Sequence, residues 1–120
     1  LEVLDDSNWP ASTLAVVQFD VGSTRPIESS WNAFVAWSSE LSRPNSGRWV
    51  ITGHTDESGG SEVNLKLSLE RASFVSNHLM QEKGWSMEGM EVSGLGSKEP
   101  LGTDAAQNRR VEVRWVRSLQ

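Results

Sequence analysis

Residues 48–83 have the sequence RWVITGHTDESGGSEVNLKLSLERASFVSNHLMQEK, and this stretch decides the fold. Arg48–Thr52 has the length and composition of a short strand, and the polar, glycine-bearing loop Gly53–Ser61 follows it. Val63–Lys83 repeats apolar residues in steps of three and four, which predicts an amphipathic helix that ends at Gly84. The predicted buried stripe of this helix consists of Leu65, Leu69, Ala72, Val75 and Leu79.

The flanking sequence adds three strands and one helix. Leu14–Phe19 and Met90–Gly94 are short apolar runs of strand type, and Glu28–Leu41 has helical apolar spacing after Pro26. Arg110–Val116 alternates charged and apolar residues, which predicts a strand with one solvated face. The order β-α-β-α-β-β predicts an α/β (α+β) fold, a two-layer sandwich with a mixed four-stranded sheet packed by helices.

The chain has 120 residues, the size of one domain. Leu1–Thr13 is polar and is expected to be a linker or lead-in, with a single domain over residues 14–120. Pro44-Asn45-Ser46-Gly47 predicts a turn. Because the sequence begins at Leu1 rather than Met, we expect it to be part of a longer protein, whose remainder holds a targeting signal or membrane anchor.

Composition excludes several kinds of site. The net charge of −5 argues against nucleic-acid binding, which needs clustered basic residues, and against a polybasic membrane patch. The chain has no cysteine, and its two histidines, His54 and His78, lack ligand spacing, so neither a metal nor another cofactor is predicted. No Gly-x-Ser-x-Gly nucleophile motif accompanies His54, so we interpret it as a structural histidine of the loop.

Asp56 and Arg71 lie 15 residues apart, one at a strand end and one inside the following helix. For an arbitrary acid and arginine, a solvated pair or no contact is the more common outcome. Held slightly apart, the two side chains instead match a zwitterion, because a carboxylate accepts hydrogen bonds from an ammonium and a guanidinium donates to a carboxylate.

Several motifs in this order resemble the OmpA-like (OmpA/MotB C-terminal) family. The central motif is Gly53-His54-Thr55-Asp56, Gly59, Asn64, Leu67-Ser68 and Arg71-Ala72. The flanking motifs are Val17-Gln18-Phe19-Asp20-Val21-Gly22-Ser23, Gly94-Leu95-Gly96 with Pro100, and Asn108-Arg109-Arg110-Val111-Glu112-Val113. The resemblance spans Leu14 to Val116 and implies a periplasmic domain that binds peptidoglycan without catalysis.

The resemblance also implies roles for individual residues. Asp56 is expected to take the ammonium of a stem-peptide diaminopimelate and Arg71 its carboxylate. Asn64 is expected to fix the loop or touch the ligand, Leu67 to form a wall of the pocket, and Arg109 to be a second basic residue there. Gly22 and Ser23 are expected to bring backbone N–H groups near the carboxylate.

Other readings of the sequence stay open. The fold without its ligand would be a protein-interaction module, whereas a wall hydrolase lacks a candidate nucleophile or metal site. The parent is expected to be a membrane-anchored stator, secretion, lipoprotein or porin-type protein. A second copy of the chain, in a homodimer, is a further partner that the sequence leaves open. Among the tryptophans, Trp31, Trp37, Trp49 and Trp115 are expected in the core, and Trp9 and Trp85 at the surface. Arg110 and Arg114 are expected on the solvated strand face.

Overall fold

The computed structural model describes residues 13–41 and 47–116. It contains the strands β1 (Thr13–Gln18), β2 (Arg48–Gly53), β3 (Met90–Gly94) and β4 (Arg110–Val116). Its helices are α1 (Glu28–Ser39), α2 (Ser61–Lys83) and α3 (Ala105–Asn108), with the 3-10 turn η1 (Met87–Gly89). The predicted strands and long helices are confirmed to within two residues at each end. The short elements α3 and η1 were missed, because three or four residues carry no readable period.

Some expectations fall at the limits of the described chain. Thr13, assigned to the lead-in, is instead the first residue of β1. The rest of the predicted lead-in, including Trp9, and most of the predicted turn around Pro44 lie outside the described residues. Within the part of the chain that the structure describes, no helix has both the length and the apolar character required to cross a membrane.

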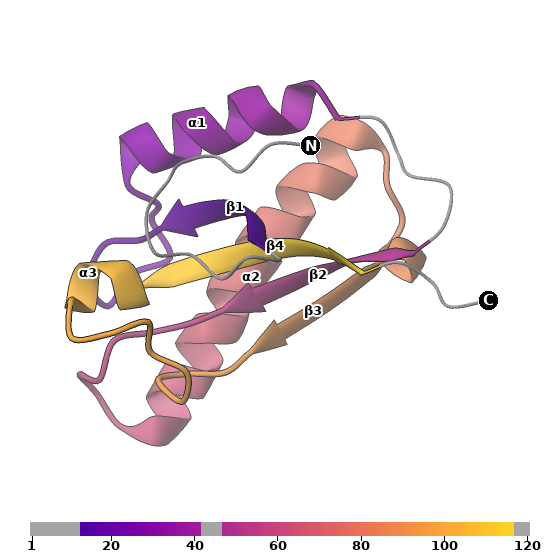
Figure 1. The fold of residues 1–120 in the computed structure, drawn as a ribbon. Coiled ribbons are helices and arrows are strands. Elements are labelled where there is room, and N and C mark those ends of the chain that lie inside the picture. Colours follow the sequence, from indigo (N-terminus) through magenta and orange to yellow (C-terminus); the bar gives the residue numbers. More distant parts are fainter. Residues whose placement is uncertain (1–12, 42–46, 117–120) are drawn as a thin grey trace.

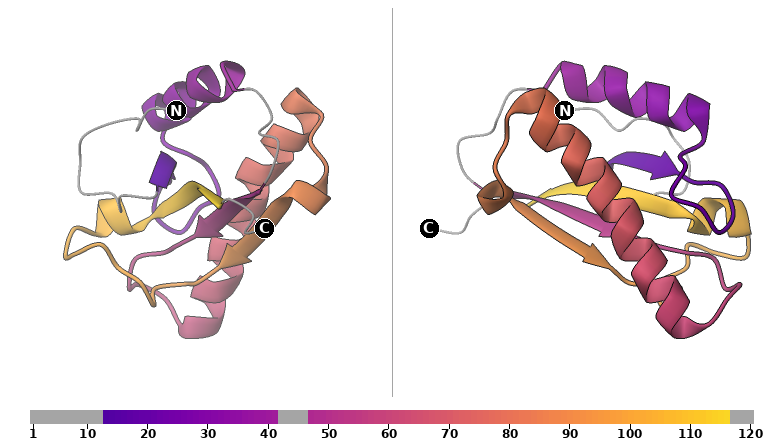
Figure 2. Two further views of the ribbon diagram at one scale, coloured as in Figure 1. Left: turned by 45° about the vertical axis from the view of Figure 1, so that its right-hand side comes forward. Right: turned by 180° about the vertical axis from the view of Figure 1, so that it is seen from behind.

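The sheet is mixed and has the strand order β1-β4-β2-β3. β4 runs antiparallel to both β1 and β2, whereas β2 and β3 are parallel. The long helices α1 and α2 pack on one face of this sheet, and α2 crosses the strands diagonally (Figures 1 and 2). The predicted two-layer sandwich is therefore confirmed.

The core lies between the sheet and the two helices. Alternate residues of β1 and β4, among them Val17 and Val113, meet Phe34 of α1 and Val75 of α2 there. This alternation follows from the strand period, which sends every second side chain to the same face. Burial of these side chains stabilises the two-layer arrangement at about 25 cal/mol for each Å² of apolar surface removed from water.

The buried face of α2 differs from the predicted stripe in its N-terminal half. Leu69 is 46% exposed and Leu65 is also exposed, whereas the polar residues Asn64, Ser68 and Arg71 are buried. The strands beneath explain this: a Cβ on Gly53 or Gly94 would collide with the α2 backbone near Ser68. Two glycines thus let the helix approach so closely that only a small residue fits between helix and sheet.

Trp85 is not at the surface, as the sequence predicted, but 7% exposed. Its ring stacks on Trp49 of β2, with centroids 5.5 Å apart and planes at 9°. Trp49 also contacts Trp37 and Trp115, both of which are half-buried against the core. Trp85 follows the αL C-cap Gly84, which turns the chain back toward the sheet and places the ring there.

The polar face of β4 is likewise not solvated over its first residues. Arg110 and Glu112 are buried, and the Arg110 Nε atom donates to the Glu112 carboxylate at 2.7 Å. Arg110 also donates to the carbonyl oxygens of Asn108 and Glu99. Internal pairing, rather than water, therefore satisfies these charges, as buried ions require.

We expect Trp85→Ala to lower the free energy of unfolding by about 3–5 kcal/mol, since it deletes a buried ring and leaves a cavity against Trp49. Met87→Ala, at the first position of η1 and 52% exposed, is the control and should change stability by about 0.5 kcal/mol or less. Urea denaturation followed by tryptophan fluorescence measures both variants. Equal midpoints for the two would contradict the packing described here.

Candidate functional site

A cavity of about 330 Å³ lies where the end of β2, the loop after it and the first three turns of α2 meet the loop between β1 and α1. We call it the Asp56–Arg71 pocket. Its lining residues are Gly22, Thr55, Asp56, Ser58, Gly59, Val63, Asn64, Lys66, Leu67, Glu70 and Arg71. Five residues predicted from the sequence are therefore gathered in one place: Gly22, Asp56, Asn64, Leu67 and Arg71.

Arg71 forms the floor of the site and is 0% exposed. Its Nε atom donates to the Ser23 carbonyl at 2.8 Å, and Nη2 donates to the Asp20 carbonyl at 3.0 Å. Its Nη1 atom donates to the His54 carbonyl at 2.9 Å. The guanidinium also lies 5.3 Å from the centroid of the Phe19 ring. Arg71 thus joins α2 to the β1–α1 loop and to the end of β2.

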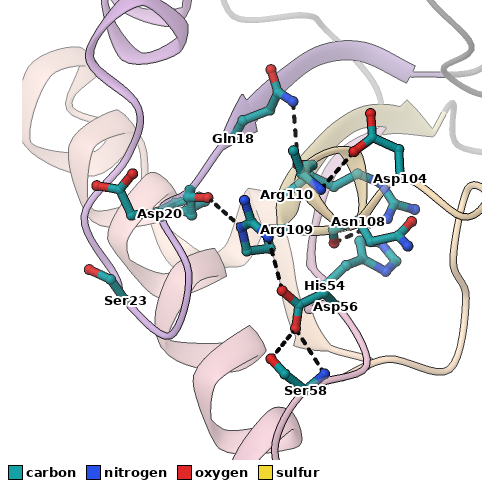
Figure 3. Close-up of polar contacts among 12 residues, drawn as sticks. Gln18, Asp20, Ser23, His54, Asp56, Ser58, Asp104, Asn108, Arg109 and Arg110 are labelled. Carbon is teal, nitrogen blue, oxygen red and sulfur yellow. Dashed lines mark hydrogen bonds and ion pairs between the residues drawn. The ribbon is translucent and has the colours of Figure 1, made fainter.

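Asp56 also lines the pocket and is held by two other residues, Ser58 and Arg109 (Figure 3). Its Oδ1 atom accepts hydrogen bonds from the Ser58 backbone N–H at 3.0 Å and from the Ser58 hydroxyl at 2.5 Å. Its Oδ2 atom accepts from Arg109 Nη1 at 3.0 Å. The simple alternative of a direct Asp56–Arg71 ion pair does not occur, because each group is already bonded elsewhere.

Both charges persist at neutral pH. Burial raises the pKa of the Asp56 carboxyl, but the hydrogen bonds from Ser58 and Arg109 outweigh it, so the pKa lies below its usual value. Burial lowers the pKa of Arg71 to about 10, with the Asp56 carboxylate opposing this shift and the Arg109 charge adding to it. Asp56 therefore provides a fixed negative charge and Arg71 a fixed positive charge in a pocket whose lining also includes Lys66 and Glu70.

Three further residues predicted for the site, Asn64, Arg109 and Ser23, are bonded to the loops around the pocket. Asn64 is buried, and its Nδ2 atom donates to the Gly59 carbonyl at 3.5 Å, so it fixes the loop before α2. Arg109 does not line the pocket but reaches it through Asp56, and its Nε atom also donates to the Phe19 carbonyl. Ser23 stays outside the pocket lining, and its N–H donates within the turn to the Asp20 carbonyl at 3.3 Å.

Sequence reasoning missed several lining residues. Ser58, Lys66 and Glu70 are polar residues of a loop and of an exposed helix face, where such residues are common and carry no signal of their own. Lys66 and Glu70 lie one helical turn apart on α2, and so do Val63 and Leu67. The helical spacing around Leu67 and Arg71 is therefore the signal that could have identified these lining residues.

Beneath the site lies a second group of charges. His54 is buried, as expected of a structural histidine, and its Nε2 atom is 3.9 Å from a Glu112 oxygen. Its backbone N–H donates to the Arg110 carbonyl, so it also joins β2 to β4. The pKa of His54 is lowered to about 4, mainly by burial; the charge of Arg110 adds to the lowering, that of Glu112 opposes it, and that of Arg114 adds to it. His54 is therefore neutral at pH 7.

The arrangement is suited to recognition of a ligand that carries both charges. Within residues 13–41 and 47–116, no three His, Cys, Asp or Glu side chains are placed to hold a metal ion. Asp56 can accept from a cation while it keeps its bonds to Ser58 and Arg109, because a carboxylate has about four acceptor sites.

Comparison with known proteins places the site in context. The model of the OmpA family matches residues 18–114. The peptidoglycan-associated lipoprotein of Pseudomonas aeruginosa is 30% identical over 115 residues, 92% of this chain and 66% of that protein. The peptidoglycan-binding protein ArfA of Mycobacterium bovis is 37% identical over 71 residues, 55% of this chain but only 22% of that protein.

A solved structure agrees with the sequence matches. The crystal structure of the peptidoglycan-associated lipoprotein from Burkholderia pseudomallei superposes with a TM-score of 0.72 at 33% identity, covering 85% of this chain and 90% of that one. The fold is thus shared with this lipoprotein.

The buried neutral His54 predicts a pH-dependent stability. The unfolded histidine binds a proton below about pH 6.5 and the folded one only near pH 4, so stability is lost as the pH falls through this window. Between pH 7 and pH 5 the loss should be on the order of 1–2 kcal/mol. His54→Gln should flatten this part of the profile. Urea unfolding at pH 7, 6 and 5 measures it, and equal slopes for the two proteins would contradict a buried neutral His54.

Proposed function

The chain belongs to the OmpA family, and from this membership we propose that it binds peptidoglycan without cleaving it and thereby fixes a larger envelope protein to the cell wall. The observation that carries the proposal is the Asp56–Arg71 pocket, in which two opposite charges are held apart by bonds to other groups. The names of the relatives, which include a peptidoglycan-binding protein and a peptidoglycan-associated lipoprotein, support it.

The ligand proposed for this pocket is the side-chain end of a stem-peptide diaminopimelate. Once built into a peptide, this residue still carries one free ammonium and one free carboxylate. Asp56 accepts from the ammonium at an acceptor site that Ser58 and Arg109 leave open. The aliphatic part of the ligand side chain then lies along Leu67 and Val63, which supply apolar wall on α2.

The carboxylate of the ligand faces Arg71. Among the hydrogen bonds of the described residues, Arg71 uses three of its five N–H groups, which leaves one hydrogen on each terminal nitrogen. We propose that these two hydrogens bind the carboxylate of the ligand. Because the side chain is fully buried, we propose that the Gly22 turn, which lines the pocket, shifts slightly when the carboxylate enters. Gly22 has a φ of +62° and no Cβ to hinder that approach.

The wider setting is part of the same proposal. The chain spans 22% of the ArfA relative and 66% of the Pseudomonas lipoprotein, so each of these relatives has further segments. We propose that the present domain lies in the periplasm and that a membrane-anchored segment of its parent protein is tethered to the wall through it. The anchoring role needs only reversible binding, since many domains in one envelope act together.

Asp56→Asn is expected to weaken binding to diaminopimelate-type peptidoglycan. The loss of the charge leaves the ligand ammonium without its partner, which costs about 2–5 kcal/mol, or roughly 30- to 4000-fold in affinity. The amide oxygen can still accept from Ser58, so the loop keeps these two bonds, whereas the bond to Arg109 is lost. Glu62→Gln removes the same charge from the exposed first turn of α2, outside the pocket lining, and should bind as the parent does.

Co-sedimentation with purified peptidoglycan and titration with soluble fragments measure this effect, and thermal melts show whether each variant is folded. A folded Asp56→Asn protein that still binds like the parent would refute the proposed ligand contact. Arg71 is a poor first target, because its substitution also removes three bonds to backbone carbonyls and so tests the fold.

Two wall chemistries separate recognition of the zwitterion from general adhesion. Lysine-type peptidoglycan presents the ammonium without the carboxylate, so binding to it should be at least about tenfold weaker. Incubation with either wall should release no soluble muropeptides, since the proposal contains no bond cleavage. Equal binding to both walls would contradict the role of Arg71, and released fragments would contradict a purely binding function.

A further inference from the structure

We propose that the binding site continues past Asp56 into a second pocket, which takes an uncharged part of the stem peptide next to the diaminopimelate. This inference rests on the proposed function, because it concerns the rest of the same ligand. The second pocket has a volume of about 340 Å³, and we call it the Asp56–Ala105 pocket. It is lined by Asp56, Glu57, Ser58, Pro100, Gly102, Thr103, Ala105 and Asn108.

The two pockets share a wall. Asp56 and Ser58 line both, so the carboxylate that is proposed to bind the ammonium stands at their junction. A diaminopimelate residue that fills the Asp56–Arg71 pocket has peptide main chain on its other end, which must leave that pocket. The Asp56–Ala105 pocket opens directly beside the shared wall and has a similar volume, so it is the nearest space for a neighbouring residue.

The far wall of the second pocket is built in advance. Asn108 is buried, and its Oδ1 atom accepts from the Leu101 N–H at 2.7 Å while Nδ2 donates to the Gly102 carbonyl at 3.1 Å. The Asp104 side chain accepts from the Ala106 N–H and caps α3 (Figure 3). Because these bonds fix the segment 101–108, a ligand does not have to order it, which favours binding.

Charge decides what the second pocket accepts. Its lining includes the acids Asp56 and Glu57 and no basic side chain. Arg109 is bonded to Asp56, which leaves Glu57, an exposed residue, as the charge that a ligand meets first. A second carboxylate of the stem peptide would therefore be repelled, whereas alanine or an amidated glutamate meets backbone, the Thr103 hydroxyl and the small Ala105. The pocket is suited to a neutral peptide segment.

A pair of adjacent alanines on α3 tests the inference. Ala105 and Ala106 are both exposed, but only Ala105 lines the second pocket. Ala105→Trp fills that pocket, and Ala106→Trp adds the same ring beside it. The probes are diaminopimelate capped at one end as in a peptide, and a synthetic stem tetrapeptide with amidated glutamate. Isothermal titration gives the affinity of each variant for each probe.

The tetrapeptide should bind the parent protein more tightly than the capped residue does. Ala105→Trp should remove most of that difference, a loss of roughly fivefold or more, and leave the capped residue within about twofold. Ala106→Trp should leave both affinities unchanged. Equal binding of the two probes by the parent, or an equal effect of the two tryptophans, would overturn the inference.

The charge argument has its own measurement. A tetrapeptide with the free glutamate carboxylate should bind the parent more weakly than the amidated one, and Glu57→Gln should narrow that gap. If Glu57→Gln leaves the difference in affinity between the two tetrapeptides unchanged, the proposed selectivity is wrong. A failure of the proposed function would give a different result. The parent protein would then not bind the capped diaminopimelate, or the Asp56→Asn variant would bind it as tightly as the parent does.

Discussion

One buried guanidinium organises the functional end of this domain. Arg71 donates to the carbonyl oxygens of Asp20 and Ser23, in the loop between β1 and α1, and of His54, directly after β2. Removing such a charge from water is costly and is tolerated only when hydrogen bonds satisfy it. Each charge-assisted hydrogen bond offsets part of this desolvation free energy and fixes the position of a backbone segment. The walls of the Asp56–Arg71 pocket therefore depend on the same side chain that is proposed to bind the ligand.

This arrangement also keeps the pocket open to a zwitterion. An acid and an arginine that face one cavity would ordinarily neutralise each other. Here Asp56 is satisfied by Ser58 and Arg109, and Arg71 by carbonyl oxygens, so the two charges do not form an ion pair with each other. A ligand with matching charges meets groups that are already oriented, which lowers the entropy cost of binding. Arg109 acts here as a positioning residue, because it holds Asp56 without lining the pocket.

Stability and recognition are concentrated at opposite ends of β2. The first half of the strand contributes Trp49, which packs between Trp37, Trp85 and Trp115. The strand ends at Gly53, and Thr55 and Asp56 shortly after it line the Asp56–Arg71 pocket. Between the two ends, Gly53 and Gly94 bring α2 against the sheet near Ser68, and this close approach places Asn64 and Arg71 under the loops. The glycines therefore position the site as much as the charged residues do.

The order of the long elements, the two-layer fold and five of the residues that line the Asp56–Arg71 pocket could be predicted from the residues along the chain. Apolar periods are local signals, so they predict the elements without knowledge of the partners. The pocket residues between Gly53 and Ala72, and Gly22, followed instead from the resemblance to the OmpA-like family. Only the tertiary structure decided that Asp56 pairs with Arg109, 53 positions away, and that Arg110 pairs with Glu112 inside the protein. It also decided that Trp85 is buried and that the N-terminal half of α2 turns polar residues inward. These features depend on contacts between segments that are far apart in the sequence. The residue pattern of one segment does not determine which other segment will pack against it.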